Sequence, residues 1–288
     1  MDQPYSDRYW TSSDGLKLHY RDYPGPEGAS LAPVLCMHGL TRNSRDFAEL
    51  AEHISRHRRV IVPEMRGRGM SDYASDSATY NPVVYVADVE ALLAEQEIDR
   101  FVAIGTSLGG LMTMLLAAKL PGKLAGAVLN DIGPQVETSG IERIAGYVGH
   151  GGSFPTWMHA ARALEEVHGH AFPKYTLDQW LEMAKRTLVV GQNGRISFDY
   201  DMAIAEPFKE VDNAVPPDLW PAFDALKEVP LLLLRGALSD LISQGAVDKM
   251  TSRHSDMKAV TVADVGHAPM LDEPEALTAI DELLARVP

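Results

Sequence analysis

The chain has 288 residues, of which 45% are hydrophobic and 23% charged, and its formal net charge is −14 at pH 7. This length can bury a large core, and the composition is that of an ordinary globular protein. The negative charge argues against nucleic-acid binding, which needs a basic surface, and it disfavours highly anionic substrates unless a local basic patch offsets it.

Cysteine content and hydropathy narrow the class of protein further. The single cysteine, Cys36, cannot form an internal disulfide. Residues 1–20 hold no positively charged stretch followed by an apolar run, and the longest apolar runs of the chain are too short to cross a bilayer. These features predict a cytoplasmic protein that acts on a small molecule, with neither a nucleic-acid nor a membrane partner. They leave the oligomeric state open.

The chain begins with a hairpin pattern. Residues 10–23 alternate apolar and polar side chains around the Asp14-Gly15 pair, which is a strong signal for two antiparallel strands. Six later segments are short apolar runs that suit buried strands: residues 32–39, 58–69, 99–107, 124–134, 229–240 and 258–267. Helical patterns lie among them, at residues 45–55, 82–97, 108–120, 244–254 and 274–286. This alternation predicts an α/β fold with a mostly parallel, doubly wound sheet.

The alternation stops between residues 133 and 217. This stretch contains aromatic clusters and helical patterns at residues 156–167 and 177–188, but no run typical of a buried strand. The strand pattern resumes near Val229, so we expect a helical cap inserted after the sixth core strand. The predicted organisation is a core of residues 1–132 and 218–288, with a cap of residues 133–217.

Residues 102–115 read VAIGTSLGGLMTML, an apolar run that carries one serine between glycines. The segment GTSLGG follows a predicted strand and begins a predicted helix, which is the setting of a G-x-S-x-G nucleophile turn. Gly105 and Gly109 permit a tight turn, so the hydroxyl of Ser107 is expected at the carboxyl edge of the sheet. Ser107 is therefore the predicted nucleophile, and the alternative is an ordinary serine N-cap.

A serine hydroxyl needs a basic partner, because it is a weak nucleophile on its own. His267 is the preferred base, since it lies in a loop between the last predicted strand and the last predicted helix. Four histidines fall in the predicted cap, His150, His159, His168 and His170, and the HGH segment there could suggest a metal site. No carboxylate or cysteine has the spacing to complete such a site, so no metal is expected.

A carboxylate must hold the histidine in place. Asp240 is the first choice, because it closely follows the strongly apolar run LLLLR. Asp131 also follows a predicted strand, in VLNDIGP, and is the second choice. Asp264 and Asp272 flank His267 but fit equally well as loop and helix-start residues. The predicted triad therefore takes its acid from Asp240, with Asp131 left open.

These motifs resemble those of the α/β-hydrolase family from about Trp10 to the end of the chain, except in the predicted cap. HGLT resembles the family's oxyanion segment, and EMRGRGMSD resembles its D-x-R-G-x-G-x-S segment, with Glu64 in place of the usual aspartate. The order serine, aspartate, histidine also matches. The resemblance implies an oxyanion hole formed by the backbone N–H groups of Leu40 and Leu108, with His38 supporting that turn and not acting as the base. It also implies that no cofactor is needed.

The expected activity is that of a serine hydrolase that cleaves a carboxylic ester or a lactone with an apolar portion through an acyl-enzyme. Serine at the turn argues against dehalogenases and epoxide hydrolases of this fold, which carry aspartate there. The aromatic and methionine content of the cap predicts an apolar pocket. The candidate substrate-binding residues are Arg42, Trp157, Met158 and Trp180.

Three other functions stay open. Hydrolytic C–C cleavage of vinylogous diketones uses the same triad, and Arg42 could bind the substrate carboxylate that such enzymes hold with an arginine. A prolyl aminopeptidase would need acidic cap residues for the substrate amine, for which Glu165, Glu166 and Glu182 are available. A non-catalytic ligand receptor on the same fold could also keep all three triad residues.

Overall fold

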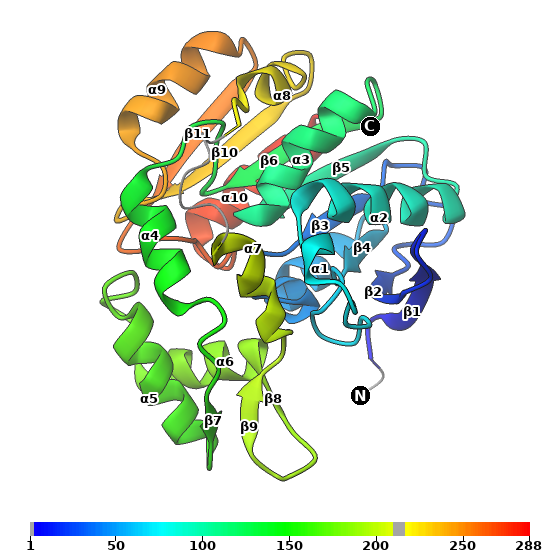
Figure 1. Ribbon diagram of the computed structural model, residues 1–288. Helices are drawn as coiled ribbons and strands as arrows, with labels where there is room; N and C mark the ends of the chain where they lie inside the picture. Colours follow the sequence, from blue (N-terminus) through cyan, green and yellow to red (C-terminus); the bar gives the residue numbers. More distant parts are fainter. Residues whose placement is uncertain (1–2, 210–216) are drawn as a thin grey trace.

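A computed structural model describes residues 3–209 and 217–288, and its central sheet has eight strands in the order β1-β2-β4-β3-β5-β6-β10-β11 (Figure 1). The strands are β1 (Ser6–Thr11), β2 (Lys17–Tyr23), β3 (Val34–Met37), β4 (Val60–Pro63), β5 (Phe101–Thr106), β6 (Leu124–Asn130), β10 (Leu231–Gly236) and β11 (Met257–Val262). The pairs β1–β2 and β2–β4 are antiparallel, and all other neighbouring pairs are parallel. The predicted hairpin and the mostly parallel sheet are therefore confirmed.

Helices cover both faces of this sheet (Figure 1). The helices that accompany the central strands are α1 (Ala48–Ser55), α2 (Pro82–Glu95), α3 (Leu108–Lys119), α8 (Trp220–Asp224), α9 (Gln244–Arg253) and α10 (Pro274–Ala285). Local signals fix where several of them begin. Asn81 accepts a hydrogen bond from the Val84 amide at the start of α2, and Ser243 does the same for the Ala246 amide at the start of α9.

The central strands are buried on both sides, which explains why their sequences are continuous apolar runs. In β10, Leu231 and Leu233 belong to one hydrophobic cluster, whereas Leu232 and Leu234 belong to a second cluster on the opposite face. This division follows the two-residue period of a strand. The first cluster includes side chains of α2, α3, α8 and α9, and the second includes those of α1 and α10.

Residues 133–217, here called the inserted segment, lie between β6 and β10; positions 210–216 of this segment are outside the described residues. Its helices are α4 (Thr138–Tyr147), α5 (Trp157–His168), α6 (Leu177–Thr187) and α7 (Glu206–Lys209). The bounds of α5 and α6 agree with the predicted helical ranges to within one residue. Three short strands, β7 (Ser153–Phe154), β8 (Leu188–Val190) and β9 (Ile196–Phe198), form a small antiparallel sheet.

The small sheet was not predicted, although the sequence carries a signal for it. Asn193 and Gly194 lie between Val190 and Ile196, and the Asn-Gly pair between apolar residues is typical of a hairpin turn. Gly194 has a φ of 73°. The strands are too short and too exposed to give the continuous apolar run that marks a buried strand.

Several polar contacts fix the inserted segment to the remainder of the molecule. Arg45 donates a hydrogen bond to the backbone oxygen of Arg186 at 2.9 Å and forms an ion pair with Asp199 at 2.7 Å. The hydroxyl of Tyr80 donates to Asp201 at 2.6 Å. Within residues 3–209 and 217–288, no helix has both the length and the apolar character required to span a membrane.

Candidate active site

Ser107 lies in the turn between β5 and α3, and its backbone adopts a φ of 52° and a ψ of −111°. A positive φ is strained for serine. Close backbone contacts explain both flanking glycines: a Cβ at Gly105 would lie 2.2 Å from the oxygen of Gly109, and a Cβ at Gly109 would lie 2.0 Å from the oxygen of Met37. The turn therefore requires glycine at both positions, and it presents the Ser107 side chain beside the N-terminus of α3.

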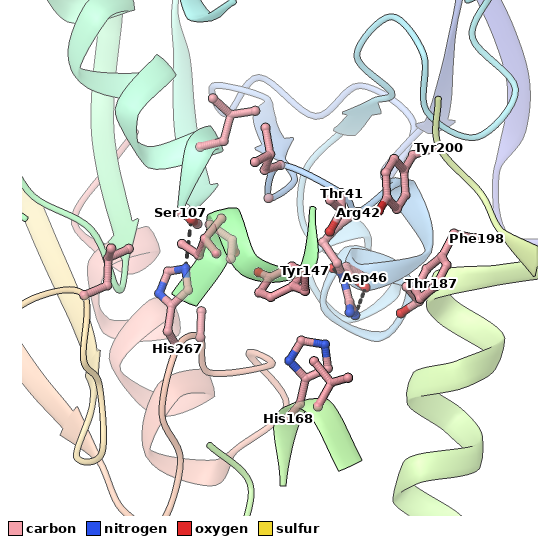
Figure 2. Close-up of a pocket in the computed structure, with 18 of the residues that line it drawn as sticks. Thr41, Arg42, Asp46, Ser107, Tyr147, His168, Thr187, Phe198, Tyr200 and His267 are labelled. Carbon is pink, nitrogen blue, oxygen red and sulfur yellow. Dashed lines mark hydrogen bonds and ion pairs between the residues drawn. The ribbon is translucent and has the colours of Figure 1, made fainter. Parts of the chain in front are cut away.

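His267 follows β11 and joins Ser107 to a carboxylate. Its Nε2 lies 2.9 Å from Oγ of Ser107 (Figure 2), and its Nδ1 lies 2.8 Å from Oδ2 of Asp131. The side chain of His267 is 7% exposed, and that of Asp131 is fully buried. A carboxylate that accepts from Nδ1–H leaves the lone pair of Nε2 directed at the serine hydroxyl. This geometry suits proton transfer from Ser107 to His267.

Asp131 is held rigidly by the neighbouring strand. It comes directly after β6, and its Oδ1 accepts a hydrogen bond from the Gly236 amide at 2.9 Å. Its Oδ2 accepts a second hydrogen bond from the hydroxyl of Ser239 at 2.6 Å. Gly236 ends β10 and Ser239 lies in the loop after it, so the strand beside β6 sets the orientation of the carboxylate.

Asp240 has a different partner, so the structure corrects the sequence-based expectation that its carboxylate, rather than that of Asp131, contacts His267. Its carboxylate forms a bidentate ion pair with Arg143 of α4, with Nε and Nη2 at 2.5 and 2.7 Å from the two oxygens. The hydrogen bonds from Arg143 lower the pKa of Asp240. Both aspartates follow adjacent strands at the same edge of the sheet, but Asp240 lies several positions beyond the end of β10, where it meets the inserted segment.

His38 fixes the peptide unit that contains the carbonyl of Gly39 and the N–H of Leu40. Its Nδ1 donates to the oxygen of Gly39 at 2.7 Å, and its Nε2 accepts from the backbone N–H of Met65 at 3.0 Å. Burial lowers the pKa of His38 to about 4, so the ring is neutral at pH 7. In a trans peptide the N–H points opposite to the carbonyl. The Leu40 N–H is therefore directed away from His38.

Arg68 holds the next carbonyl of the same turn. Its Nε donates to the oxygen of Leu40 at 2.9 Å, while its Nη1 donates to the oxygen of Arg66 and to the hydroxyl of Tyr85. Leu108, directly after Ser107, is the first residue of α3, where backbone N–H groups have no acceptor within the helix. Leu40 and Leu108 thus offer two backbone donors beside Ser107, where the sequence predicts an oxyanion hole.

Ser107 and His267 open into a cavity of about 770 Å³ between the sheet and the inserted segment. Side chains from both parts line it, as Figure 2 shows for Thr41 and Tyr147. Most of its walls are apolar and include Leu111, Ile132, Ile144, Leu164, Val167 and Phe198. The size and lining fit a small-molecule site, in which a few polar groups set the orientation of an otherwise apolar ligand.

Arg42, a candidate substrate-binding residue, lies in the wall of this cavity, but the three cap residues named with it do not. Trp180 is buried in the inserted segment, where its ring packs edge-on against Phe172 and Tyr175. Met158 is 44% exposed. Trp157 is absent from the described cavity wall and packs, partly buried, against the second hydrophobic cluster, which joins side chains of the sheet and of the inserted segment. The expectation that these three residues line the substrate pocket is therefore corrected.

The helical period predicts which face of α5 turns inward, but it does not predict which end of the helix reaches the cavity. Leu164, Val167 and His168 line the cavity, and Trp157 is two turns before Leu164 on the same face. Seven residues of helix span about 10 Å, so Trp157 lies well away from the part of the cavity that Leu164 and His168 line. Sequence reasoning missed His168 as a lining residue, because a histidine in a helical pattern gives no signal of its neighbours.

The histidines of the inserted segment have no metal-binding arrangement in the described part of the chain, where no group of three or more His, Cys, Asp or Glu side chains could hold an ion. His168 packs edge-on against Tyr147, with ring centroids 5.2 Å apart. Burial, together with the nearby charge of Arg42, lowers the pKa of His168 to about 3. His168 is therefore a neutral polar group in the cavity at pH 7.

The doubly wound sheet, the strained serine turn and the histidine after the last strand define an α/β hydrolase. A family model for the alpha/beta hydrolase fold matches residues 32–274, and the chain belongs to this family. The chain is 34% identical over 265 residues to 3-hydroxybutyrate-oligomer hydrolase of Cupriavidus necator, covering 90% of this chain and 89% of that one. These similarities show that the protein is a hydrolase.

Two further proteins extend the comparison. A crystal structure of an alpha/beta hydrolase from Novosphingobium aromaticivorans shares 58% sequence identity with this chain, covers both chains completely and superposes with a TM-score of 0.95. The 2-(acetamidomethylene)succinate hydrolase of Mesorhizobium japonicum is 25% identical over 234 residues, which cover 81% of each chain. This chain therefore shares its fold and its hydrolase class with these proteins.

Proposed function

We propose that this hydrolase cleaves carboxylic esters through an acyl-enzyme, with Ser107 as nucleophile, His267 as base and Asp131 as the acid. One observation carries the proposal: the continuous hydrogen-bonded chain from Ser107 through His267 to Asp131, at 2.9 and 2.8 Å. Serine, imidazole and buried carboxylate in this order provide an activated nucleophile. The strained turn and the adjoining cavity give that nucleophile access to a bound ester.

In the proposed reaction, His267 removes the proton of Ser107 as Oγ attacks the ester carbonyl. The negative oxygen of the tetrahedral intermediate accepts hydrogen bonds from the N–H groups of Leu40 and Leu108, each worth roughly 10²- to 10³-fold in rate. His267 then gives the proton to the leaving alcohol, and the acyl group remains on Ser107. Water attacks this acyl-enzyme with the same proton transfers in reverse, which releases the carboxylic acid.

The neutral His38 supports this step by keeping the Leu40 N–H in place before the charge develops. A preorganised donor needs no reorientation during the reaction, which is the main advantage of an oxyanion hole over water. A charged histidine at this position would lose the lone pair that accepts from the Met65 amide. The lowered pKa keeps His38 neutral, and the neutral ring makes both hydrogen bonds that hold the turn.

The substrate that we propose is a small linear ester of hydroxy acids with short apolar side chains. Support comes from the largely apolar cavity and from the identity with a relative that carries the name 3-hydroxybutyrate-oligomer hydrolase. In this proposal the inserted segment acts as the cap that closes the cavity. A lactone would occupy the same space, but the cavity volume of about 770 Å³ leaves ample room for a linear dimer.

A prolyl aminopeptidase has less support. The cap acids that could hold a substrate amine, Glu165, Glu166 and Glu182, are absent from the described cavity wall. Glu165 pairs with Arg162, and Glu182 pairs with Lys185, on exposed surface. The acidic residue that does line the described cavity, Asp46, is already paired with Arg42.

Ester hydrolysis is tested by comparing wild type with Ser107→Ala on p-nitrophenyl butyrate and on the linear dimer of 3-hydroxybutyrate. Wild type should hydrolyse both and react covalently with an alkyl phosphonate, whereas Ser107→Ala should do neither while keeping the wild-type circular dichroism spectrum. Lack of any turnover by wild type would favour the ligand receptor. Residual turnover of Ser107→Ala within tenfold of wild type would place the nucleophile elsewhere.

A further inference from the structure

Arg42 is a cation in a largely apolar cavity, and ester cleavage at Ser107 does not by itself require it. Among the described residues that line the cavity, it is the only arginine or lysine. Burial alone would lower the pKa of Arg42, but the charge and hydrogen bonds of Asp46 raise it, so the guanidinium stays charged. A charged group kept at the wall of a ligand site points to an anionic partner in the ligand.

Asp46 holds one edge of the guanidinium and leaves the other available. Nε and Nη2 of Arg42 each donate to Asp46 at 2.6 Å, on the same edge of the plane (Figure 2). Nη1 donates to none of the described residues. The end formed by Nη1 and Nη2 is therefore still able to bind a carboxylate in the two-point geometry typical of arginine. Asp46 fixes the plane of this end in advance.

Neutral polar groups from the inserted segment accompany Arg42. His168 lies close enough for Arg42 to depress its pKa, and neither of its ring nitrogens hydrogen-bonds to a described residue. Tyr147 packs against His168 and also lines the cavity. A neutral imidazole can donate one hydrogen bond to an anion. The wall near Arg42 thus offers donors from both the core and the inserted segment.

Arg42 and the proposed nucleophile both lie near Gly39. A Cβ built at Gly39 would lie 3.4 Å from Cγ of Arg42 and 3.9 Å from Cβ of Ser107. The arginine side chain therefore starts beside the serine and extends along the cavity wall toward His168 (Figure 2). A ligand group bound at its far end would lie within the length of a small molecule from Oγ of Ser107.

We propose that Arg42, with His168 beside it, binds the free carboxylate of the ester substrate and so fixes the scissile carbonyl over Ser107. This inference rests on the proposed ester hydrolysis and narrows it to monoesters that keep one ionised carboxyl group. The net charge of −14 repels such a substrate at long range. A cation inside the cavity compensates for that repulsion at the site itself.

The test compares the linear dimer of 3-hydroxybutyrate with the same dimer as its neutral carboxamide, and it measures kcat/KM for the internal ester by chromatography. The acid-to-amide ratio is the readout, because it cancels effects common to both substrates. Arg42→Gln combined with Asp46→Asn removes both charges without leaving an unpaired carboxylate at the cavity wall. It should lower the ratio roughly 10- to 100-fold, mainly through KM, since hydrogen bonds to a charged group are lost.

Of two further variants, one should change the ratio in the opposite direction and the other is a control. Asp46→Asn alone removes the negative charge behind Arg42 and should raise the ratio a few-fold. Arg162→Gln combined with Glu165→Gln removes an arginine–carboxylate pair on the exposed surface of α5, absent from the described cavity wall, and it should leave the ratio unchanged. An unchanged ratio in the Arg42 and Asp46 double variant would overturn the proposal, even if wild type hydrolyses both dimers.

Binding separates this proposal from the catalytic one. Isothermal titration of the dimer into Ser107→Ala measures affinity without turnover. The same titration into Ser107→Ala carrying the Arg42 and Asp46 changes should give a dissociation constant at least tenfold weaker, and equal affinities would refute the carboxylate site. Failure of wild type to hydrolyse both p-nitrophenyl butyrate and the dimer would instead refute the ester hydrolysis, whatever the titrations show.

Discussion

Ser239 donates its hydroxyl hydrogen to Oδ2 of Asp131 at 2.6 Å, the same oxygen that accepts from Nδ1 of His267 at 2.8 Å. The hydroxyl of Ser239 also accepts hydrogen bonds from the backbone N–H groups of Leu241 and Ile242, at 3.3 Å each. A hydroxyl that accepts two bonds has one hydrogen left to give. The loop after β10 therefore directs that hydrogen at the proposed acid.

Ser239→Ala should lower kcat about tenfold with little change in KM, because a hydrogen bond to a carboxylate is worth roughly 1.5 to 3 kcal/mol and only part of this is felt in the transition state. Steady-state kinetics on p-nitrophenyl butyrate measures the effect. Ser239→Thr keeps the hydroxyl and should restore most of the rate. Equal losses in the alanine and threonine variants would show that the role of Ser239 is packing.

Asp131→Asn should lower kcat by about 10³- to 10⁴-fold, because the amide favours the wrong tautomer of His267 and does not stabilise its charged form. Asp240→Asn should cost less than tenfold, since Asp240 pairs with Arg143 and not with the histidine. The two variants are compared on the same ester at pH 7.5. The opposite ranking would return the acid to Asp240.

The stability of the protein should depend on His38 in mildly acidic solution. Its pKa is about 4 when folded and 6.5 in the unfolded chain, so between these values the unfolded state binds the proton. The stabilising contribution is complete above pH 6.5 and decreases as the pH falls toward 4, by about 3 kcal/mol in all. Urea unfolding of wild type at several pH values measures this loss.

His38→Asn provides the control for that experiment, because asparagine keeps a donor near the position of Nδ1 but does not titrate. The difference in unfolding free energy between wild type and His38→Asn should shrink as the pH falls from 7 to 4.5. Other buried groups, such as His168, titrate in both proteins and cancel in the difference. A constant difference over this range would contradict the assignment of a neutral, buried His38.

Gly109→Ala should prevent folding or destabilise the protein by more than about 3 kcal/mol, since the new Cβ would lie 2.0 Å from the oxygen of Met37. Gly245 is the matched control. It lies exposed in α9, has an ordinary φ and has no heavy atom within 4 Å of a built Cβ. Gly245→Ala should be neutral or stabilise by about 0.4 to 1 kcal/mol. Thermal unfolding followed by circular dichroism distinguishes the two.

The sequence predicts the central sheet well, because buried parallel strands leave continuous apolar runs and a serine turn requires glycines at fixed spacing. Ser107 and His267 were found because each follows a recognisable strand, and the structure places them 2.9 Å apart. The choice between Asp131 and Asp240 depends on which of two loops at one sheet edge turns toward the histidine. A single sequence carries no signal for that direction.

The inserted segment was predicted less well for a related reason. Its helices have clear amphipathic periods, so their bounds were nearly correct. Which end of α5 reaches the cavity depends on how the whole segment packs on the sheet, and that is a tertiary relationship. Trp157 and Met158 were therefore placed in the pocket, whereas His168 at the other end of the same helix lines it.

Residues 38–46 carry the turn that we propose forms the oxyanion hole, the Arg42–Asp46 pair, and the contacts of Asn43 and Arg45 with the Arg186 carbonyl. The stretch that positions a reacting group is thus the stretch that anchors the inserted segment. Exchange of inserted segments between relatives is an obvious way to seek new selectivity. In this chain Asn43 and Arg45 keep these bonds only if a transplanted segment places a backbone carbonyl where that of Arg186 lies, so we expect chimaeras to work best when residues 38–46 and the insert come from the same parent.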